Sequence, residues 1–219
     1  MATSTRTKVK RLPDRGRYER PEIDAILDEA IVCHIGFEDA GQPFVIPSLH
    51  ARVGDVLYLH GSSASRMLRL LAAGAPCCVT VTLVDGVVLA RAVFDQSVNY
   101  RSVVVLGRPR PVEDPDEKLA ALEALTNQLV PGRWADTRPP TRQELKGTTI
   151  VALALDEASA KVRSGPPGNA PEDADAYADT WTGVLPITQV VGEPIPAPDL
   201  SAGVPVPDAL RRYGERFAR

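Results

Sequence analysis

The sequence predicts a mostly antiparallel β protein, with short strands closed into a barrel or folded as a sandwich and only a few helices. Several short apolar runs, each bounded by turn residues, follow one another between residues 30 and 112. Few helical segments separate these runs, whereas an α/β fold needs a helix after each strand. The chain has 219 residues, 44% of them hydrophobic and 24% charged, which is ordinary for one buried core with appendages.

The first element that we expect is a helix over residues 20–30, RPEIDAILDEA. Pro21 suits its first turn, and Ile23, Ile26 and Leu27 fall on one face. Strand-like runs then cover residues 30–37, 43–53, 56–60, 76–84, 87–94 and 101–112. The pair Asp85-Gly86 lies between two of these runs and predicts a β-hairpin turn.

Capping sequences predict two further helices. In residues 114–130, Asp114 is the expected N-cap, Pro115 suits the first position, and Glu117 completes a capping box. A second box, Thr141 to Glu144, predicts a short helix before the last strong strand, residues 148–155.

Composition divides the chain into a basic arm (1–19), a barrel domain (20–165) and a proline-rich segment (166–219). The arm is expected to be a solvated tail rather than a contact for nucleic acid or a membrane. The proline-rich segment lacks the apolar periodicity for its own core, apart from an apolar island around Trp181 and Leu185. We expect it to be extended and to pack on the barrel or on a partner subunit.

Bulk properties argue against several classes of function. The net charge of −3 and the 5% aromatic content do not favour nucleic-acid binding. No apolar run approaches the ~20 residues of a membrane helix, and the N-terminus lacks a signal-peptide core. We therefore expect a cytoplasmic protein that binds no membrane. Cys33, Cys77 and Cys78 are expected to be free thiols, because neighbouring residues on a strand point to opposite faces.

The stretch LHGSSASRMLRLLAAG, residues 59–74, has two interpretations. In the first, Ser62 or Ser63 caps a short helix that ends at Gly74. In the second, the free N–H groups and hydroxyls, together with Arg66, bind a phosphate. A second segment with an arginine and a hydroxyl, Arg101-Ser102, begins a strand about thirty residues further on.

Six segments in this order resemble one family: PFVIPSLH, VLYLHGSSASRMLRLL, VNYRSVVVLGR, PGRW, SAKVRSGPP and WTGVLPI. They look like the FMN-binding split-barrel flavoproteins of the pyridoxamine 5'-phosphate oxidase-like superfamily, in the branch of the nitroimidazole-resistance proteins. The resemblance covers about residues 18–187. It implies an antiparallel split β-barrel of six strands, forming a homodimer with two FMN molecules in the subunit interface.

The resemblance also implies which residues bind the flavin. The ring would contact the backbone of Val45, Ile46, Pro47 and Ser48. The ribityl chain would lie near His60, Gly61 and Ser62, and the phosphate would meet Ser65, Arg66 and the adjacent Met67. Arg101 and Ser102 would approach from the adjoining strand, and Trp181 from the other subunit. Met67 stands where the classical oxidase has a second basic residue, which disfavours pyridoxal-phosphate activity.

The three histidines do not indicate a metal site. His34, His50 and His60 lack the close spacing of a zinc motif, so structural or ring-contacting roles are favoured. Haem ligation by one of them is the least favoured cofactor prediction. Lys161 and Arg163 are expected as surface cations, with a substrate-binding role as the alternative.

No Gly-x-Ser-x-Gly or Ser/His/Asp pattern indicates a hydrolase. The resemblance implies an FMN-dependent oxidoreductase that transfers hydride or electrons between a nicotinamide and a small acceptor, such as a nitroaromatic or quinone-like compound. Two alternatives remain open: a flavin carrier or sensor without turnover, and a deazaflavin-dependent reductase on the same fold.

Overall fold

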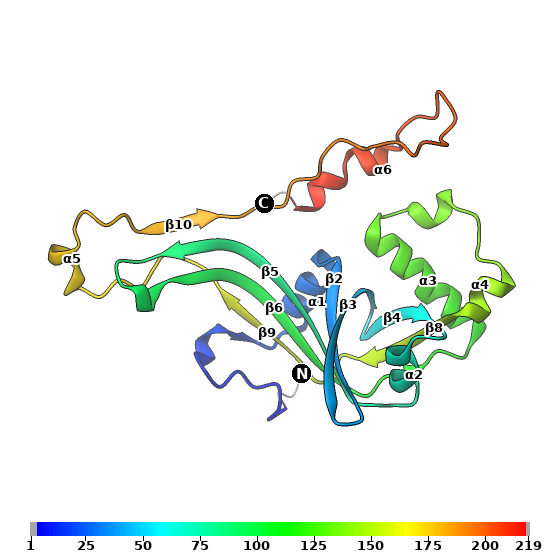
Figure 1. Ribbon diagram of the computed structural model, residues 1–219, viewed down its shortest axis with the longest axis horizontal. Helices are drawn as coiled ribbons and strands as arrows, with labels where there is room; N and C mark the ends of the chain where they lie inside the picture. Colours follow the sequence, from blue (N-terminus) through cyan, green and yellow to red (C-terminus); the bar gives the residue numbers. More distant parts are fainter. Residues whose placement is uncertain (1–3, 218–219) are drawn as a thin grey trace.

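A ten-stranded antiparallel sheet dominates the computed structural model, which describes residues 4–217 (Figure 1). The strand order is β1-β9-β6-β5-β2-β3-β4-β8-β7, and β10 pairs separately with β5. The antiparallel fold with few helices is therefore confirmed. The sheet has more strands than the six expected, and it is not closed.

The strands are β1 Gly16–Arg17, β2 Val32–Asp39, β3 Gln42–Val53, β4 Val56–Ser62, β5 Cys77–Leu89, β6 Ser97–Gly107, β7 Arg110–Pro111, β8 Thr148–Ala154, β9 Ala158–Arg163 and β10 Gly183–Pro186. The α-helices are α1 Arg20–Glu29, α2 Arg66–Ala72, α3 Pro115–Leu129, α4 Arg142–Gly147, α5 Asp173–Ala176 and α6 Asp208–Arg211. Short 3-10 helices are η1 Pro13–Arg15, η2 Val93–Asp95, η3 Arg133–Asp136 and η4 Tyr213–Phe217.

The capped helices form where their sequences predict them. The Asp114 carboxylate accepts the Glu117 N–H at 2.8 Å and begins α3. The Glu117 carboxylate, however, binds Arg110 and the Tyr58 hydroxyl, so it is drawn away from the cap. In α4 both halves of the predicted capping box are present, at Thr141 and Glu144.

The predicted hairpin turn at Asp85-Gly86 is wrong. Strand β5 continues through this pair, with a shift of register between Val84 and Gly86 that marks a bulge. A Cβ atom on Gly86 would lie 3.0 Å from the Leu185 carbonyl oxygen, so the glycine allows β10 to approach closely. The chain reverses only after Leu89, near η2, which makes β5 and β6 a long hairpin (Figure 1).

Two apolar clusters hold the body together. The larger one lies between the inner face of the sheet and helices α1 and α2, and includes the predicted Ile23, Ile26 and Leu27. The smaller one lies under α3 and includes Tyr58 and Ile150. Cys33 and Cys77 are buried in the larger cluster, and all three cysteines are free, as expected.

The basic arm packs on the sheet rather than extending into solvent. Strand β1 pairs with β9, the Tyr18 hydroxyl accepts the Val9 N–H at 2.9 Å, and Arg6 forms an ion pair with Glu157. Thr7 is only 6% exposed. The arm is therefore an ordered part of the fold that packs on the sheet, in contrast to the expected solvated tail.

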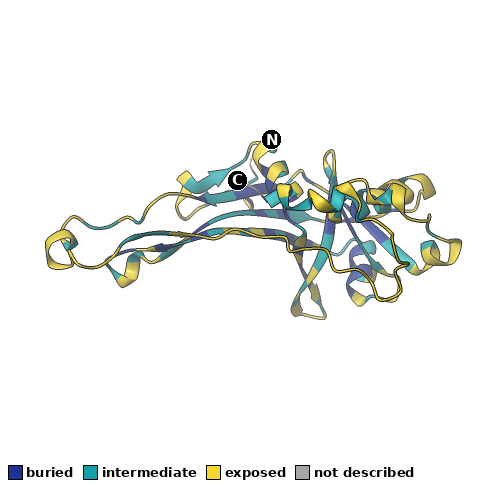
Figure 2. Ribbon diagram, turned by 90° about the horizontal axis from the view of Figure 1, so that it is seen from above, coloured by how far each residue is buried: buried dark blue, intermediate teal, exposed yellow. Residues whose placement is uncertain are grey.

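The segment after β9 is extended and largely exposed, as Figure 2 shows. Trp181 and Leu185 are 65% and 58% exposed, so the apolar island does not bury itself in this chain. Near the C-terminus, Arg216 donates to the carbonyl oxygens of Asp28, at 2.7 Å, and Gln128. This arginine fastens η4 to the C-terminal ends of α1 and α3. Within residues 4–217, no helix combines the length and apolar character needed to cross a membrane.

Candidate functional site

The sheet splits between β3 and β4. The two strands pair only from His50 to Val53 and from Val56 to Leu59. Towards the other end, β3 stays paired with β2, while β4 pairs with β8 from Val56 to Ser62. Among the described residues, one edge of each strand therefore has no strand partner at the split. Such edges present N–H and C=O groups, which suits the backbone contacts predicted for residues 45–48.

The predicted ring-contacting stretch has one open face. Val45 is 66% exposed and Pro47 is also exposed, whereas Ile46 and Ser48 on the opposite face are half-buried. Ile46 packs against the larger core cluster. The alternation thus anchors the strand through one face and leaves the other face free for a ligand.

His60 and Gly61 lie across the split on β4. Burial lowers the pKa of His60, and its buried Nδ1 has no hydrogen-bond partner in the part of the chain that the structure describes. A Cβ atom on Gly61 would lie 3.1 Å from Leu68 Cδ2, which explains the glycine by the close packing of α2. His60 therefore keeps an uncommitted polar atom beside the split.

The serines after β4 are only partly used by the protein. Ser65 Oγ accepts the Leu68 N–H at 3.4 Å and is the N-cap of α2, so the expected cap at Ser62 or Ser63 is wrong. The reason is that β4 continues through Ser62 and delays the helix start. Met67 is 5% exposed and belongs to the larger core cluster.

Arg66 is held loosely at the surface. Its guanidinium lies 4.1 Å from the centroid of the Phe44 ring, and its Nη1 lies 3.3 Å from Asp39 Oδ2. The Arg66 side chain is half-exposed, and a surface ion pair contributes only about 0–1 kcal/mol. A phosphate could displace Asp39 at little cost in stability.

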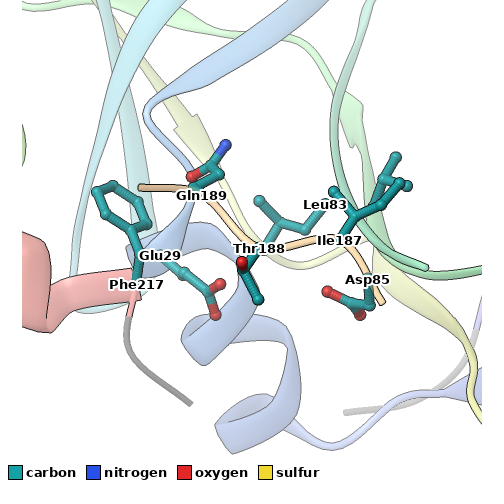
Figure 3. Close-up of a pocket in the computed structure, with 8 residues that line it drawn as sticks. Glu29, Leu83, Asp85, Ile187, Thr188, Gln189 and Phe217 are labelled. Carbon is teal, nitrogen blue, oxygen red and sulfur yellow. The ribbon is translucent and has the colours of Figure 1, made fainter. Parts of the chain in front are cut away.

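Arg101 lies in a different environment. Two of its hydrogen bonds reach Glu29, at 2.6 and 2.8 Å, and two reach Asp85, at 3.0 and 3.3 Å. Both carboxylates line a cavity of about 40 Å³, a space for little more than one water molecule. Figure 3 shows them on either side of Thr188. Arg101 is therefore fully engaged by acidic side chains.

The structure does not bring β6 beside the split. Strands β5 and β2 separate β6 from β3, which amounts to roughly 14 Å at the usual strand spacing. Ser102 Oγ donates to the Lys161 carbonyl oxygen at 3.2 Å. Trp181 precedes β10, which pairs with the far part of β5, and Figure 1 shows β10 and β4 at opposite sides of the molecule. The predicted cofactor contacts of these residues stay predictions.

One histidine that the sequence did not assign to the flavin site by position faces the same open surface. His34 on β2 is exposed and is paired with Pro47 and Thr80. Exposed Val32 and Val45 lie near it on β2 and β3. The signal in the sequence was the alternation itself, because buried Cys33 and Ile35 flank the histidine and direct it outward.

Two solved structures are similar to this chain over nearly its whole length. The FAD and haem binding protein of Mycobacterium smegmatis is 41% identical, with a TM-score of 0.85, covering 90% of this chain and 96% of that one. The flavocytochrome Anf3 of Azotobacter vinelandii is 39% identical, with a TM-score of 0.89, covering 95% and 96%.

A more distant structure, described as a 5-nitroimidazole antibiotic resistance protein of Bacteroides thetaiotaomicron, is 22% identical with a TM-score of 0.57. It covers 67% of this chain and 86% of its own, and it supports the shared fold alone. No curated protein matches the sequence. A family model described as pyridoxamine 5'-phosphate oxidase matches residues 19–162. With most of the antiparallel sheet inside that match, the chain belongs to the pyridoxamine 5'-phosphate oxidase family.

Proposed function

We propose that this chain is a flavin-binding oxidoreductase whose flavin lies at the split between β3 and β4. The observation that carries the proposal is the divergence of these strands, which leaves their backbone edges open beside a loosely held arginine. Ser65 uses its oxygen as an acceptor in the cap, so its hydroxyl hydrogen remains able to donate to a phosphate. Arg66 would supply the charge that a phosphate requires.

The two similar proteins favour FAD as the flavin and haem as a second group. One is described as binding FAD and haem, and the other is a flavocytochrome. FMN, the cofactor predicted from the sequence, is the alternative for the same phosphate contacts. A bound flavin would supply the hydride and electron chemistry, and the chain's own residues would bind, orient and shield it.

The exposed His34 fits a haem better than the buried His50 does. Haem ligation needs one or two axial side chains on an apolar surface, not a cluster of ligands. His34 offers an exposed imidazole beside Val32 and Val45. His50 is fully buried, with its Nε2 bonded to the Leu27 carbonyl oxygen, and is therefore unsuitable. We assign His34 as the axial ligand.

We further propose that two copies of the chain form the working molecule. The outer face of β2 and β3 exposes Val32 and Val45, which a single chain leaves in contact with water. Covering such a surface is favourable at about 25 cal/mol per Å² of apolar area. A two-fold arrangement would make both flavin sites equivalent and would allow the exposed Trp181 to reach the partner's site.

The spectrum of the purified protein tests this function. Bound flavin should absorb in the visible region, bleach when a reduced nicotinamide cofactor donates hydride to it, and recover when a small acceptor reoxidises it. Extraction of the cofactor then distinguishes FAD from FMN and from a deazaflavin. A flavin that no nicotinamide reduces would favour a carrier or sensor, and a protein that binds no flavin of any kind would contradict the proposal.

Haem is tested separately by its intense absorption band. His34→Ala should abolish this band while keeping the flavin spectrum, and His50→Gln serves as the control for a structural histidine. Retention of an unchanged haem band in His34→Ala would refute the assignment.

A further inference from the structure

A second pocket lies far from the split, between the basic arm and the outer face of strands β6 and β9. Its volume is about 290 Å³, near the lower end of the range for small-molecule sites. Its floor is formed by two neighbouring pairs of the ladder, Ser102 opposite Lys161 and Val104 opposite Ser159. The arm supplies the walls with Arg6, Thr7, Val9, Lys10 and Arg11.

The lining has a single sign of charge. Four of its nine residues are cations and three carry hydroxyls, and none of the nine is acidic. Arg6 is neutralised by Glu157. Within residues 4–217, the side chains of Lys10, Arg11 and Lys161 make no hydrogen bond or ion pair with the protein. Three cations of the pocket are thus uncompensated.

Nearby charges strengthen this positive character. Arg163, two residues beyond Lys161 on β9, is only 9% exposed and binds Asn99 together with backbone carbonyl oxygens. Burial, and to a lesser degree the charge of Arg15, lower the pKa of Arg163. Arg163 and Arg15 therefore add further positive charge near Lys161.

The pocket is built rather than formed by chance contacts of a flexible tail. Thr7 is 6% exposed, the Tyr18 hydroxyl holds the Val9 backbone, and β1 adds a strand to β9. The cations are thus placed by hydrogen bonds and burial that do not involve their own charged groups. Like charges held together without an acidic partner are destabilising, which a bound anion would relieve.

We propose that this pocket binds a phosphate-bearing ligand, with Lys10, Arg11 and Lys161 as the charged contacts and the Ser159 hydroxyl as a donor. Guanidinium, ammonium and hydroxyl groups are the donors from which phosphoryl oxygens accept hydrogen bonds. Three uncompensated cations suit a ligand that carries two neighbouring phosphates and therefore several negative charges. The phosphates could belong to a free small molecule or to the distal part of a dinucleotide that also lies on this sheet face.

The test is a calorimetric titration of the full-length protein, as purified, with inorganic pyrophosphate. Binding should occur once per chain. Lys10→Met and Lys161→Met should each weaken it at least ten-fold, since a charged hydrogen bond contributes roughly 1.5–3 kcal/mol. Lys8→Met is the matched control, because Lys8 is an exposed lysine of the same arm outside the lining, and it should change affinity less than two-fold.

Flavin content, measured in the same variants, identifies the source of the phosphates. Normal flavin with weakened pyrophosphate binding in Lys10→Met and Lys161→Met means a separate ligand. No pyrophosphate binding to the wild type, with flavin lost in these two variants but not in Lys8→Met, means that the cofactor's own phosphates occupy the pocket. Equal effects of all three variants, or no pyrophosphate binding with flavin content unchanged, would overturn the proposal without touching the flavin site itself.

Discussion

The surroundings of Arg66 and of Arg101 differ in the one respect that decides whether an arginine can bind a ligand. Arg66 is half-exposed and has one carboxylate neighbour, at 3.3 Å. Arg101 is 18% exposed and makes four hydrogen bonds to Glu29 and Asp85. Both arginines lie next to serines in the sequence, and both were predicted to bind the same phosphate.

The difference shows that an arginine's availability depends on the acids around it and not on its own motif. At Arg66 a ligand phosphate must displace Asp39, whose surface ion pair contributes only about 0–1 kcal/mol. At Arg101 it would have to displace two partly buried carboxylates, which would then lose their partner. The first region can exchange partners, whereas the second region is a structural clamp that joins α1, β5 and β6.

Removing the clamp should have the largest effect on stability. Arg101→Ala leaves Glu29 and Asp85 without their common partner, and we expect unfolding free energy to fall by about 2–3 kcal/mol. This is less than the 3–5 kcal/mol of a fully buried pair, because these side chains are 18–24% exposed. Urea denaturation measures the loss. Flavin affinity, compared at a temperature where both proteins are folded, should stay unchanged.

A marked loss of flavin in folded Arg101→Ala would contradict the purely structural role of Arg101 and with it the difference between the two regions. Arg101→Lys is the matched control, since it keeps the charge but not the paired hydrogen bonds, and its stability should be intermediate.

Removing Arg66, the arginine that can exchange its partner, should instead weaken cofactor binding. Arg66→Ala should lower FMN affinity by ten- to a hundred-fold, because one charge-assisted hydrogen bond contributes roughly 1.5–3 kcal/mol. Riboflavin, which has no phosphate, should bind the variant and the wild type equally. The measurement is the affinity of both flavins for both proteins. Equal losses for the two ligands would mean that Arg66 does not contact phosphate.

Removing the C-terminal segment tests the surroundings of the clamp, because Arg101, Glu29 and Asp85 themselves are not changed. Truncation after Thr188 removes Phe217, which lines the cavity beside Glu29, and Arg216, which binds the ends of α1 and α3. We expect a folded barrel with cooperative thermal unfolding, less stable by about 1–2 kcal/mol for the lost charged hydrogen bonds to carbonyl groups. Non-cooperative unfolding would show that the segment is part of the core.

The smallest effect is expected at the helix cap. Ser65→Ala should destabilise the protein by about 1 kcal/mol, because the Leu68 N–H loses its acceptor. FMN affinity should fall less than in Arg66→Ala, because Ser65→Ala removes a neutral hydroxyl and leaves the charge of Arg66 in place. Ser63→Ala is a suitable control, because its backbone N–H, which donates to the Gly147 carbonyl oxygen, is unaffected. A larger FMN loss in Ser65→Ala than in Arg66→Ala would reverse the expected ranking.

Local chemistry accounts for most elements that the sequence predicted correctly. The cap at Asp114 and the box at Thr141 and Glu144 depend on neighbours within four residues. Asp85-Gly86 has equally strong turn chemistry, yet β5 passes through it because β6 and β10 pair with both sides of the strand. Long-range pairing overrides a turn signal when both flanking segments find other partners.

By itself, the sequence determined the antiparallel class, the helices α1, α3 and α4, and the composition of the arm. These properties follow from periodicity and capping, which act over a few residues. The tertiary structure alone decided that Arg66 stays available while Arg101 is bound, and that exposed Val45 of β3 lies near His34 of β2. It also placed Lys10 and Arg11 of the arm in one pocket with Lys161, about 150 residues away in the chain. Such contacts depend on which acidic residues and strands, far apart in the sequence, become neighbours in the fold. A local sequence pattern covers only a few residues and does not specify these contacts.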